Sequence, residues 1–422
     1  WSVFQSFIAE FMEYTPVNLE DIKAVLREQR EEAERLTSSG RIIQRDVPDL
    51  LSLLSIPNVL AVLGVRRSGK STLSLLLLKG KNFAYVNFDD ERLRGFRELS
   101  KLEEAIYSLY GDVDYLLFDE IQNVEGWEPF VSRLRRAGKR IVVTGSNSGL
   151  LSGELATALT GRHVDFVLFP FSFREYLRFK GVEVSEAPTT RERAVIKDHL
   201  SKYLEEGGFP EALMLGSRAI LNSIYNDILF RDVVSRLKIR RVERFRDFAS
   251  AVISLYSSEL SITRLSRMLR IDYKTADEWL SGIVQSYLVY TVGRYSGKVS
   301  SLGENKKVYV VDPGIIHEVV VKRDLGRLME NVVAVHLLRK NQLKRVYYVK
   351  GEDYEVDFYD EVSGELIQVT YDDGIKQREV RGLVKASSWL GVSELKIVTW
   401  DEEGEMEVEG KRIRVVPLWK FL

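Results

Sequence analysis

Residues 64–72 read Gly64-Val65-Arg66-Arg67-Ser68-Gly69-Lys70-Ser71-Thr72 and fit the phosphate-binding loop pattern G-x-x-x-x-G-K-[ST]. An apolar run at 59–63 precedes the loop and predicts a buried strand, and a run of helix formers at 73–78 follows it. Gly64 and Gly69 allow a tight turn that brings backbone N–H groups close to phosphate oxygens, and the helix N-terminus adds partial positive charge. The alternative is an ordinary glycine-rich turn.

The polar residues of this loop have distinct expected uses. Lys70 is expected to reach the β- and γ-phosphates of a nucleoside triphosphate, and the Ser71 hydroxyl to ligate Mg²⁺. Arg67, Ser68 and Thr72 lie in the same turn and are expected to contact the nucleotide together with Gly64 and Gly69.

Composition limits the class of protein. The chain has 422 residues, of which 45% are hydrophobic and 29% charged, as in proteins with two to four packed domains. The sequence has neither an apolar run long enough to span a membrane nor a signal-peptide pattern, and we expect a cytoplasmic location. It has no cysteine, which excludes disulfides, thiol catalysis and thiolate metal sites, and its many Glu, Lys and Arg are typical of thermophiles. The formal net charge of −1 means that nucleic-acid contact would need a local basic patch.

Residues 1–45 predict a helical N-terminal extension. Residues 1–17 are aromatic and apolar and predict a docking helix. Asn18 is a helix cap, and a charged helix is expected from Leu19 to about Ser39, with Gly40 as its stop. The density of charge indicates a solvated face, and a coiled-coil or partner-binding helix is the alternative.

Residues 46–178 alternate between strand and helix patterns, which predicts a mostly parallel sheet. Asp119 and Glu120 end an apolar strand, and Asn147 follows the next one, at the sheet edge where such folds bind ligands. Asp119 would hold Mg²⁺ directly or through water, and Glu120 would orient and deprotonate an attacking water. Asn147 would hydrogen-bond that water or the γ-phosphate. Taken singly, an Asp-Glu pair also begins ordinary loops, and Asn147 would suit a turn.

The three motifs together resemble those of AAA+ ATPases: Gly64-x4-Gly69-Lys70-Ser71, Leu117-Phe118-Asp119-Glu120 and Thr144-Gly145-Ser146-Asn147. Residues 86–93, 159–162 and 169–175 further resemble a prokaryotic, largely archaeal family, in which an AAA+ domain is joined to a C-terminal domain of unknown function with a nuclease-like core. The resemblance covers most of the chain beyond residue 40. It implies an α/β fold with ATP as the substrate and Mg²⁺ as the cofactor.

The resemblance also implies roles for two further residues. Arg162 of Thr160-Gly161-Arg162 matches a candidate arginine finger, which would act across a subunit boundary and imply a homo-oligomer. A surface arginine paired with an acid is the alternative. Residues 179–230 predict a helical lid, and Pro210 matches a proline that packs on adenine in signalling-type relatives. The alternative is a plain helix break at Gly207-Gly208-Phe209-Pro210.

Residues 231–304 predict a winged helix, with helices at 261–269 and 273–288 and a wing at 290–298. Basic residues gather around it and could bind the phosphates of DNA or RNA: Arg236, Lys238, Arg240, Arg241, Arg244, Arg246, Arg264, Arg267 and Arg270. Asp272, Asp277 and Glu278 weaken the case for base reading at the second helix. The alternatives are pairing of the basic residues with nearby acids and a module that only packs.

Residues 305–422 predict a mixed α/β domain that opens with a strand at 307–312 and continues with a helix at 326–343, strands at 346–350, 355–359 and 365–370, a helix through 384–390 and a strand at 394–399. That order resembles the core of PD-(D/E)XK nucleases. Glu330 and Asp357 match two metal-binding acids of those enzymes, whereas Gln368 and Thr370 replace the glutamate and lysine of the E-x-K triplet. We expect a domain that holds a partner by shape and does not cut. Three hypotheses remain open: a nucleic-acid-associated ATPase, a slow nucleotide switch with a protein partner, and an ATP-gated nuclease.

Overall fold

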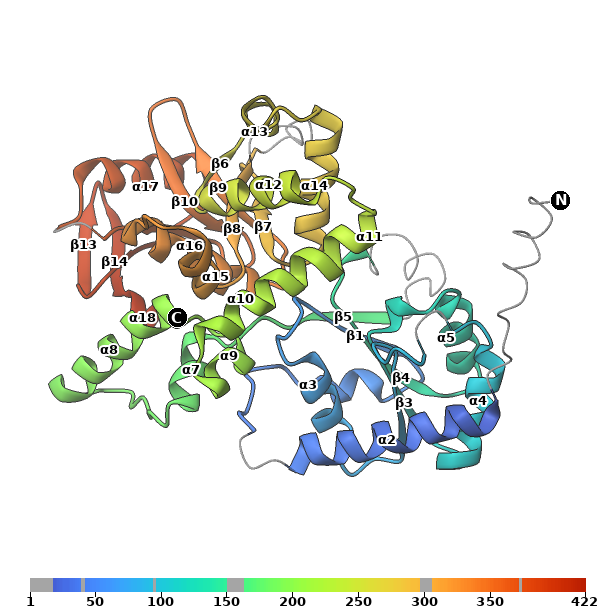
Figure 1. The fold of residues 1–422 in the computed structure, drawn as a ribbon. Helices are drawn as coiled ribbons and strands as arrows, with labels where there is room; N and C mark the ends of the chain where they lie inside the picture. Colours follow the sequence, from blue (N-terminus) through green and yellow to red (C-terminus); the bar gives the residue numbers. More distant parts are fainter. Residues whose placement is uncertain (1–17, 39–41, 94–95, 150–162, 297–305, 372–373) are drawn as a thin grey trace.

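The computed structural model describes residues 18–38, 42–93, 96–149, 163–296, 306–371 and 374–422 (Figure 1). The expected docking helix at 1–17 and Arg162 lie outside these residues. Three sheets organise the described chain, with a helical segment between the first sheet and the other two.

The first sheet is the parallel five-stranded sheet that the alternating pattern predicts, in the order β2-β3-β4-β1-β5. Its strands are β1 (Val59–Leu63), β2 (Phe83–Asn87), β3 (Tyr115–Asp119), β4 (Arg140–Gly145) and β5 (His163–Val167). Buried residues alternate between its two faces, because successive side chains of a strand point to opposite sides. Leu60 and Val62 pack in the layer of α3 (Lys70–Leu77), and Ala61 packs in the layer of α4 (Leu99–Tyr110) and α5 (Trp127–Arg136).

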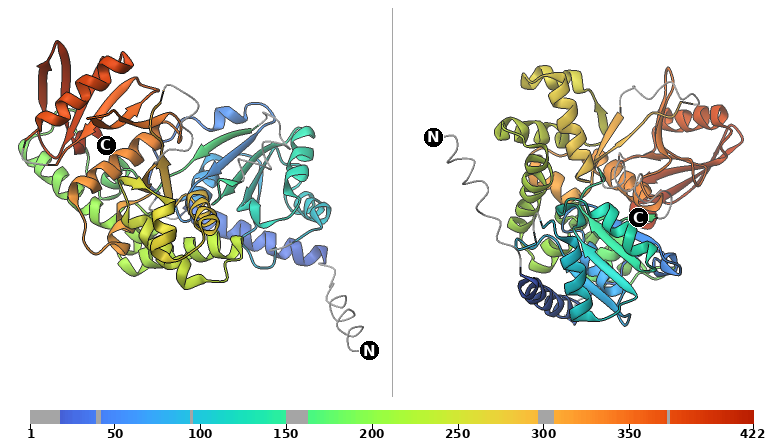
Figure 2. Two further views of the ribbon diagram at one scale, coloured as in Figure 1. Left: turned by 90° about the horizontal axis from the view of Figure 1, so that it is seen from above. Right: turned by 90° about the vertical axis from the view of Figure 1, so that its right-hand side faces the viewer.

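Helix α2 (Leu19–Ser38) has the predicted start, with the Asn18 Oδ1 atom accepting a hydrogen bond from Glu20 N. It is not solvated all round, since Ile22, Val25 and Leu26 are buried. Gln29 joins the helix to the edge strand β2 by a reciprocal pair of hydrogen bonds with the Asn87 backbone, both 2.9 Å. The helix therefore covers the edge of the first sheet (Figure 2).

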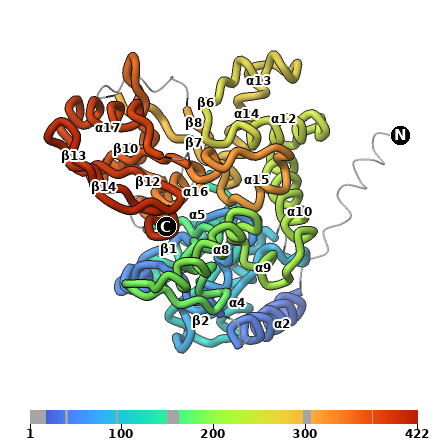
Figure 3. Tube along the Cα trace, turned by 90° about the vertical axis from the view of Figure 1, so that its left-hand side faces the viewer, coloured from blue at the N-terminus to red at the C-terminus, as the bar shows by residue number. Residues whose placement is uncertain are grey.

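A helical segment follows the first sheet. Its elements are α7 (Phe173–Phe179), α8 (Thr190–Glu206), α9 (Pro210–Leu215), α10 (Arg218–Asp227), the π-helical turn η4 (Ile228–Val234) and α11 (Ser235–Leu237). The last three are continuous and cross from the first sheet toward the second (Figure 1). The boundary that we expected between residues 230 and 231 falls inside this run, where the local sequence has no helix-breaking residue. Figure 3 views the molecule from the side on which α8 and α9 lie.

The second sheet is antiparallel, with the order β6-β8-β7. It packs with three helices in the module α12 (Val242–Ser254), β6 (Ser258–Leu260), α13 (Ile262–Leu269), α14 (Tyr273–Gln285), β7 (Val289–Val292) and β8 (Lys306–Val310). We expected the strand near residue 307 to open the C-terminal domain, and this was wrong. β8 pairs with β6 and β7, because a strand's own apolar pattern does not encode which strand it pairs with.

The third sheet is mixed, with the order β13-β14-β12-β11-β10-β9. Its region comprises α15 (Pro313–Val319), α16 (Leu325–Lys340), β9 (Val346–Lys350), β10 (Glu355–Asp360), β11 (Glu365–Val369), α17 (Gln377–Leu390), β12 (Glu394–Thr399), β13 (Gly404–Val408), β14 (Lys411–Pro417) and α18 (Leu418–Phe421). The predictions of α16, the next three strands, α17 and β12 are confirmed to within a few residues at most ends, although α17 begins seven residues before the expected start at 384. Within the described ranges, no helix is long and apolar enough to cross a membrane.

Candidate nucleotide site

The loop 64–72 joins β1 to α3, and its backbone needs both glycines. Gly64 has φ +140°, and a Cβ there would lie 2.1 Å from the Leu168 carbonyl oxygen. Gly69 has φ +97° directly before Lys70, the first residue of α3. The loop therefore presents its amides and the N-terminus of α3 at the carboxyl edge of the sheet.

Lys70 and Glu120 meet at this edge. The Lys70 Nζ atom lies 3.4 Å from Glu120 Oε1 and donates to the Val65 carbonyl at 3.2 Å. Glu120 lies in the left-handed region, at φ +51°, directly after β3, and its backbone N donates to Thr144 Oγ1 at 2.9 Å. Both side chains are buried, so each is held in place beside the loop.

Asp119 is the most enclosed acid of the site, at 2% exposure. It accepts hydrogen bonds from the hydroxyls of Thr144 and Tyr85, with Tyr85 at 3.0 Å, and the Ser71 hydroxyl lies near enough to act to lower its pKa. An aspartate and a neighbouring serine hydroxyl at the end of the loop are hard oxygen donors of the kind Mg²⁺ prefers. Ser71 and Asp119 thus fit the magnesium-binding role that the sequence predicts for them.

The pKa values of the two neighbouring acids are shifted in opposite directions. Burial, with Glu120 adding to it, raises the pKa of Asp119. Burial also acts to raise the pKa of Glu120, but the cations Lys70 and Arg66 outweigh it and hold that pKa below its ordinary value. Glu120 is therefore a carboxylate at neutral pH, the form that can accept a proton from water.

Arg66 extends the site in a way that the motif pattern does not predict. Its guanidinium binds Asp232 of η4 through two nitrogens, at 2.9 and 3.1 Å, and lies 3.5 Å from Asp89. Ser146 Oγ also donates to Asp232 at 3.2 Å, and Gln122 joins Ser146 to Glu120. The phosphate loop is thereby tied to a helix more than 160 residues away. Arg66 belongs to the loop 64–72, but nothing in the sequence around Asp232 predicts that it contacts this loop.

The neighbouring loop residues also face the helical segment. Arg67 lies 3.0 Å from Glu211 of α9, and Pro210 is the first residue of that helix. Gly207 and Gly208 pack closely, since a Cβ on Gly208 would lie 2.2 Å from the Phe171 carbonyl oxygen. Within the described part of the chain, the buried Ser68 Oγ has no hydrogen-bond partner, which leaves a polar atom of the loop available to a ligand.

Asn147 follows β4, as predicted, but its side chain binds a residue of the loop that follows and not the acids of the site. Its Oδ1 atom accepts a hydrogen bond from Gly149 N at 2.7 Å, which is the turn interaction considered as the alternative. Ser146, one residue earlier, is the side chain that reaches the acids of the site.

Arg45 joins the segment before η1 (Leu51–Leu54) to the same loop. It donates to the Ser68 carbonyl at 3.0 Å and to Glu175 of α7 at 2.9 Å. Arg339 of α16 lies 3.6 Å from the other carboxylate oxygen of Glu175. Sequence reasoning missed this junction, although Glu175 lies within the quoted stretch 169–175.

A second cluster occupies the third sheet, where the sequence suggested two acids and no lysine. Lys307 of β8 supplies the missing cation: its Nζ lies 3.2 Å from Glu330, 2.7 Å from Glu355 and 3.6 Å from Asp357. Burial, reinforced by Asp357, raises the pKa of Glu330 to about 8. Gln368 Nε2 donates to Asp357 at 2.7 Å. Lys307 therefore offsets part of the negative charge of the three acids, and Gln368 occupies one oxygen of Asp357.

The basic residues expected around the second sheet are mostly exposed. Arg244 of α12 donates to the Leu269 carbonyl at 2.8 Å, which brings the start of α12 to the end of α13. We call the exposed group there the basic patch: Arg240, Arg241, Arg244, Arg267 and Arg270. No ion pair to any of these five is found in the described ranges, since Asp232 pairs with Arg66 and Glu243 lies near Arg246. Met268 and Tyr273 are 60% and 53% exposed beside the patch.

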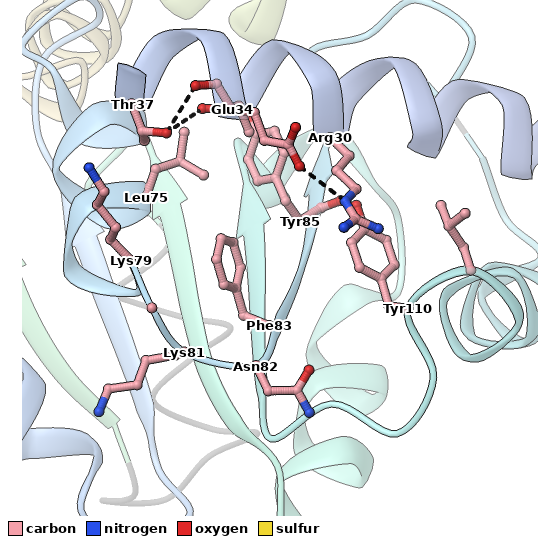
Figure 4. Close-up of a pocket in the computed structure, with 13 residues that line it drawn as sticks. Arg30, Glu34, Thr37, Leu75, Lys79, Lys81, Asn82, Phe83, Tyr85 and Tyr110 are labelled. Atoms are coloured by element: carbon pink, nitrogen blue, oxygen red, sulfur yellow. Dashed lines mark hydrogen bonds and ion pairs between the residues drawn. The ribbon is translucent and has the colours of Figure 1, made fainter. Parts of the chain in front are cut away.

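A cavity of ≈ 330 Å³ lies away from the phosphate loop, between α2, the end of α3, α4 and β2 (Figure 4). None of the described residues that line this cavity belongs to the loop 64–72, so the cavity is separate from the nucleotide site. Tyr85 connects the two places, because it lines the cavity and donates its hydroxyl to Asp119.

Comparison with known proteins agrees with this geometry. A family model described as an AAA domain matches residues 57–177, and a second, described as a domain of unknown function (DUF8612), matches residues 197–325. Among solved structures, a Walker-type ATPase of Pyrococcus abyssi is 16% identical with a TM-score of 0.45, covering 66% of this chain and 96% of that one. The Orc1 protein of Aeropyrum pernix, in complex with DNA, is 14% identical with a TM-score of 0.28, covering 78% and 97%.

Two relatives align over most of their length. An uncharacterized protein of Methanocaldococcus jannaschii is 33% identical over 414 residues, 92% of each chain. An uncharacterized protein of Haemophilus influenzae is 31% identical over 330 residues, 72% of this chain and 80% of that one. The chain therefore belongs to the family of these two relatives, and it carries an AAA-type P-loop ATPase domain followed by a domain of unknown function.

Proposed function

We propose that the chain is a Mg²⁺-dependent ATPase, in which ATP hydrolysis rearranges the module of the second sheet and the C-terminal domain. The convergence of Lys70, Ser71, Asp119 and Glu120 at one sheet edge supports this. Lys70 would bind the β- and γ-phosphates, Glu120 would take a proton from water, and Ser71 and Asp119 would hold the metal. Mg²⁺ bound there would offset the negative charge of the phosphates.

Three further roles belong to this proposal. Asn147 would turn from Gly149 toward the attacking water, Arg162 would act as a finger in the site of a neighbouring subunit, and Pro210 would contact the adenine. The finger makes the active form a homo-oligomer. A cytoplasmic location also stays a prediction.

The steady-state ATPase rate tests the proposal, measured with and without single- and double-stranded DNA and RNA, while particle size is followed with and without ATP. Hydrolysis should require Mg²⁺ and disappear in Lys70→Ala. Hydrolysis that is unchanged in Lys70→Ala would refute it.

We further propose that the module of the second sheet is a winged helix that contacts nucleic-acid phosphates through the basic patch. The exposure of these arginines supports this, because each phosphate contact by an arginine releases counterions. Replacing Arg240, Arg241 and Arg244 with Glu should weaken binding alike across sequences and flatten its salt dependence. The control is a triple variant in which Arg27, Arg30 and Arg35 of α2 are replaced with Glu, since it changes the net charge by the same amount. Equal losses in both triple variants would leave the patch without a special role.

A slow nucleotide switch with a protein partner is the second candidate. The ion pairs Lys70–Glu120 and Arg66–Asp232 favour it, because they engage the site's own groups with one another. Exposed Met268 and Tyr273 would suit an apolar protein surface. Slow turnover that no nucleic acid stimulates would favour this candidate over the first.

For the C-terminal domain we propose a nuclease-like core that holds a partner or nucleic acid without cutting it. The Lys307 ammonium among these acids supports this, because it offsets carboxylate charge that Mg²⁺ needs. An ATP-gated nuclease is the less favoured alternative.

A further inference from the structure

Arg66 stands at the phosphate end of the nucleotide site. It is the third residue of the loop, and its charge acts on Glu120, the residue proposed to take a proton from the attacking water. Its side chain is only 12% exposed, so only groups inside the site can form hydrogen bonds with the guanidinium. In the structure Asp232 accepts from two of its nitrogens, which is the bidentate geometry that arginine also offers to phosphate.

Asp232 is an unusual partner for this arginine. It is buried, and the charges of Lys70 and Glu120 affect its pKa. It lies on the π-helical turn η4, which is outside residues 57–177, the range that the AAA domain model matches. π-Helical turns are rare and often mark functional positions. A γ-phosphate bound at the loop would place new negative charge beside this carboxylate and compete for the same guanidinium.

The segment that carries Asp232 is seated on α14. A Cβ on Gly282 of α14 would lie 2.6 Å from Leu237 Cδ1 and 2.9 Å from Val233 Cγ1. Arg236 Nη2 also donates to the Gly282 carbonyl at 3.3 Å. There is thus no room between these helices for a further carbon atom, and we expect α14 to follow a shift of η4 and α11.

We propose that Asp232 is the positioning residue through which the chain distinguishes ATP from ADP: it holds Arg66 when no γ-phosphate is present and loses it when ATP binds. The freed η4 then shifts α14 and the module that contains it. This inference rests on the proposed ATPase function and adds the regulation of the same site.

The first test compares the affinities for a non-hydrolysable ATP analogue and for ADP in the full-length protein. Asp232→Asn removes the competing charge and keeps the shape, so it should raise the preference for the ATP analogue on the order of 10-fold. Arg66→Gln should abolish the wild-type preference for the analogue. Asp247→Asn, the same change at an exposed position of α12, should leave the ratio of affinities at the wild-type value. An Asp232→Asn variant that binds the ATP analogue no better, or more weakly, overturns the inference.

Amide hydrogen exchange provides a second readout that needs no variant. In the wild type, amides of 228–237 should exchange faster with the ATP analogue than with ADP, and in Asp232→Asn they should exchange equally fast with both. Identical exchange with both nucleotides in the wild type overturns the inference and leaves the ATPase proposal standing. A wild type that binds neither nucleotide overturns both.

Discussion

Replacing Glu120 with Gln separates nucleotide binding from hydrolysis. The amide keeps the size of the side chain and an oxygen for hydrogen bonding, but it cannot take a proton. Glu120 is a carboxylate in the folded protein, because Lys70 and Arg66 outweigh the effect of burial on its pKa. A general base contributes about 10²–10⁴-fold to a rate, so kcat should fall by that factor, equivalent to about 3–5 kcal/mol of activation free energy.

The assay is phosphate release at saturating ATP, with ATP affinity measured separately by equilibrium binding. Affinity should stay equal or rise, because the substitution releases Lys70 from an ion pair at 3.4 Å. Glu103→Gln is the matched control, since Glu103 pairs with Arg133 on the outside of the same domain. Wild-type turnover in Glu120→Gln, or an equal loss in Glu103→Gln, would refute the assignment of Glu120 as the base.

Three other outcomes are expected. Mixing Arg162→Ala with Lys70→Ala subunits should restore part of the ATPase activity, because some interfaces then carry both intact halves; no recovery in confirmed mixed oligomers would count against a finger in trans. The wild type should cut neither DNA nor RNA with Mg²⁺ or Mn²⁺, and metal-dependent cleavage that is lost in Asp357→Ala but kept in Lys70→Ala would revive the nuclease hypothesis. Glu330 has a pKa of about 8 when folded, against an ordinary 4.5, so the folded state binds its proton more tightly and the free energy of unfolding should fall as pH rises between these values. Denaturant unfolding of Glu330→Gln should lack this contribution, which is at most about 1.4 kcal/mol per pH unit; equal slopes in variant and wild type would show that the cluster around Lys307 is charged differently.

The sequence predicts the parts of the site that depend on local pattern. The loop, the strand that ends in Asp119 and Glu120, and most of the elements of the C-terminal sheet follow from glycine positions and apolar periodicity. Asp232 and Lys307 could not be predicted in this way. Each acts through a partner distant in the sequence, and the distance between two such residues depends on how whole elements pack.

Strand β8 has a consequence for movement within the molecule. Its backbone completes the second sheet, while its Lys307 side chain and the bonds of Val310 to Asn331 attach it to α16 and the third sheet. A strand shared in this way cannot act as a hinge, so residues 242–422 should turn as one lever arm. Any such turn would have to break the contacts that join this arm to the first sheet and α7, among them Gln342 with the Val167 backbone and Arg339 with Glu175.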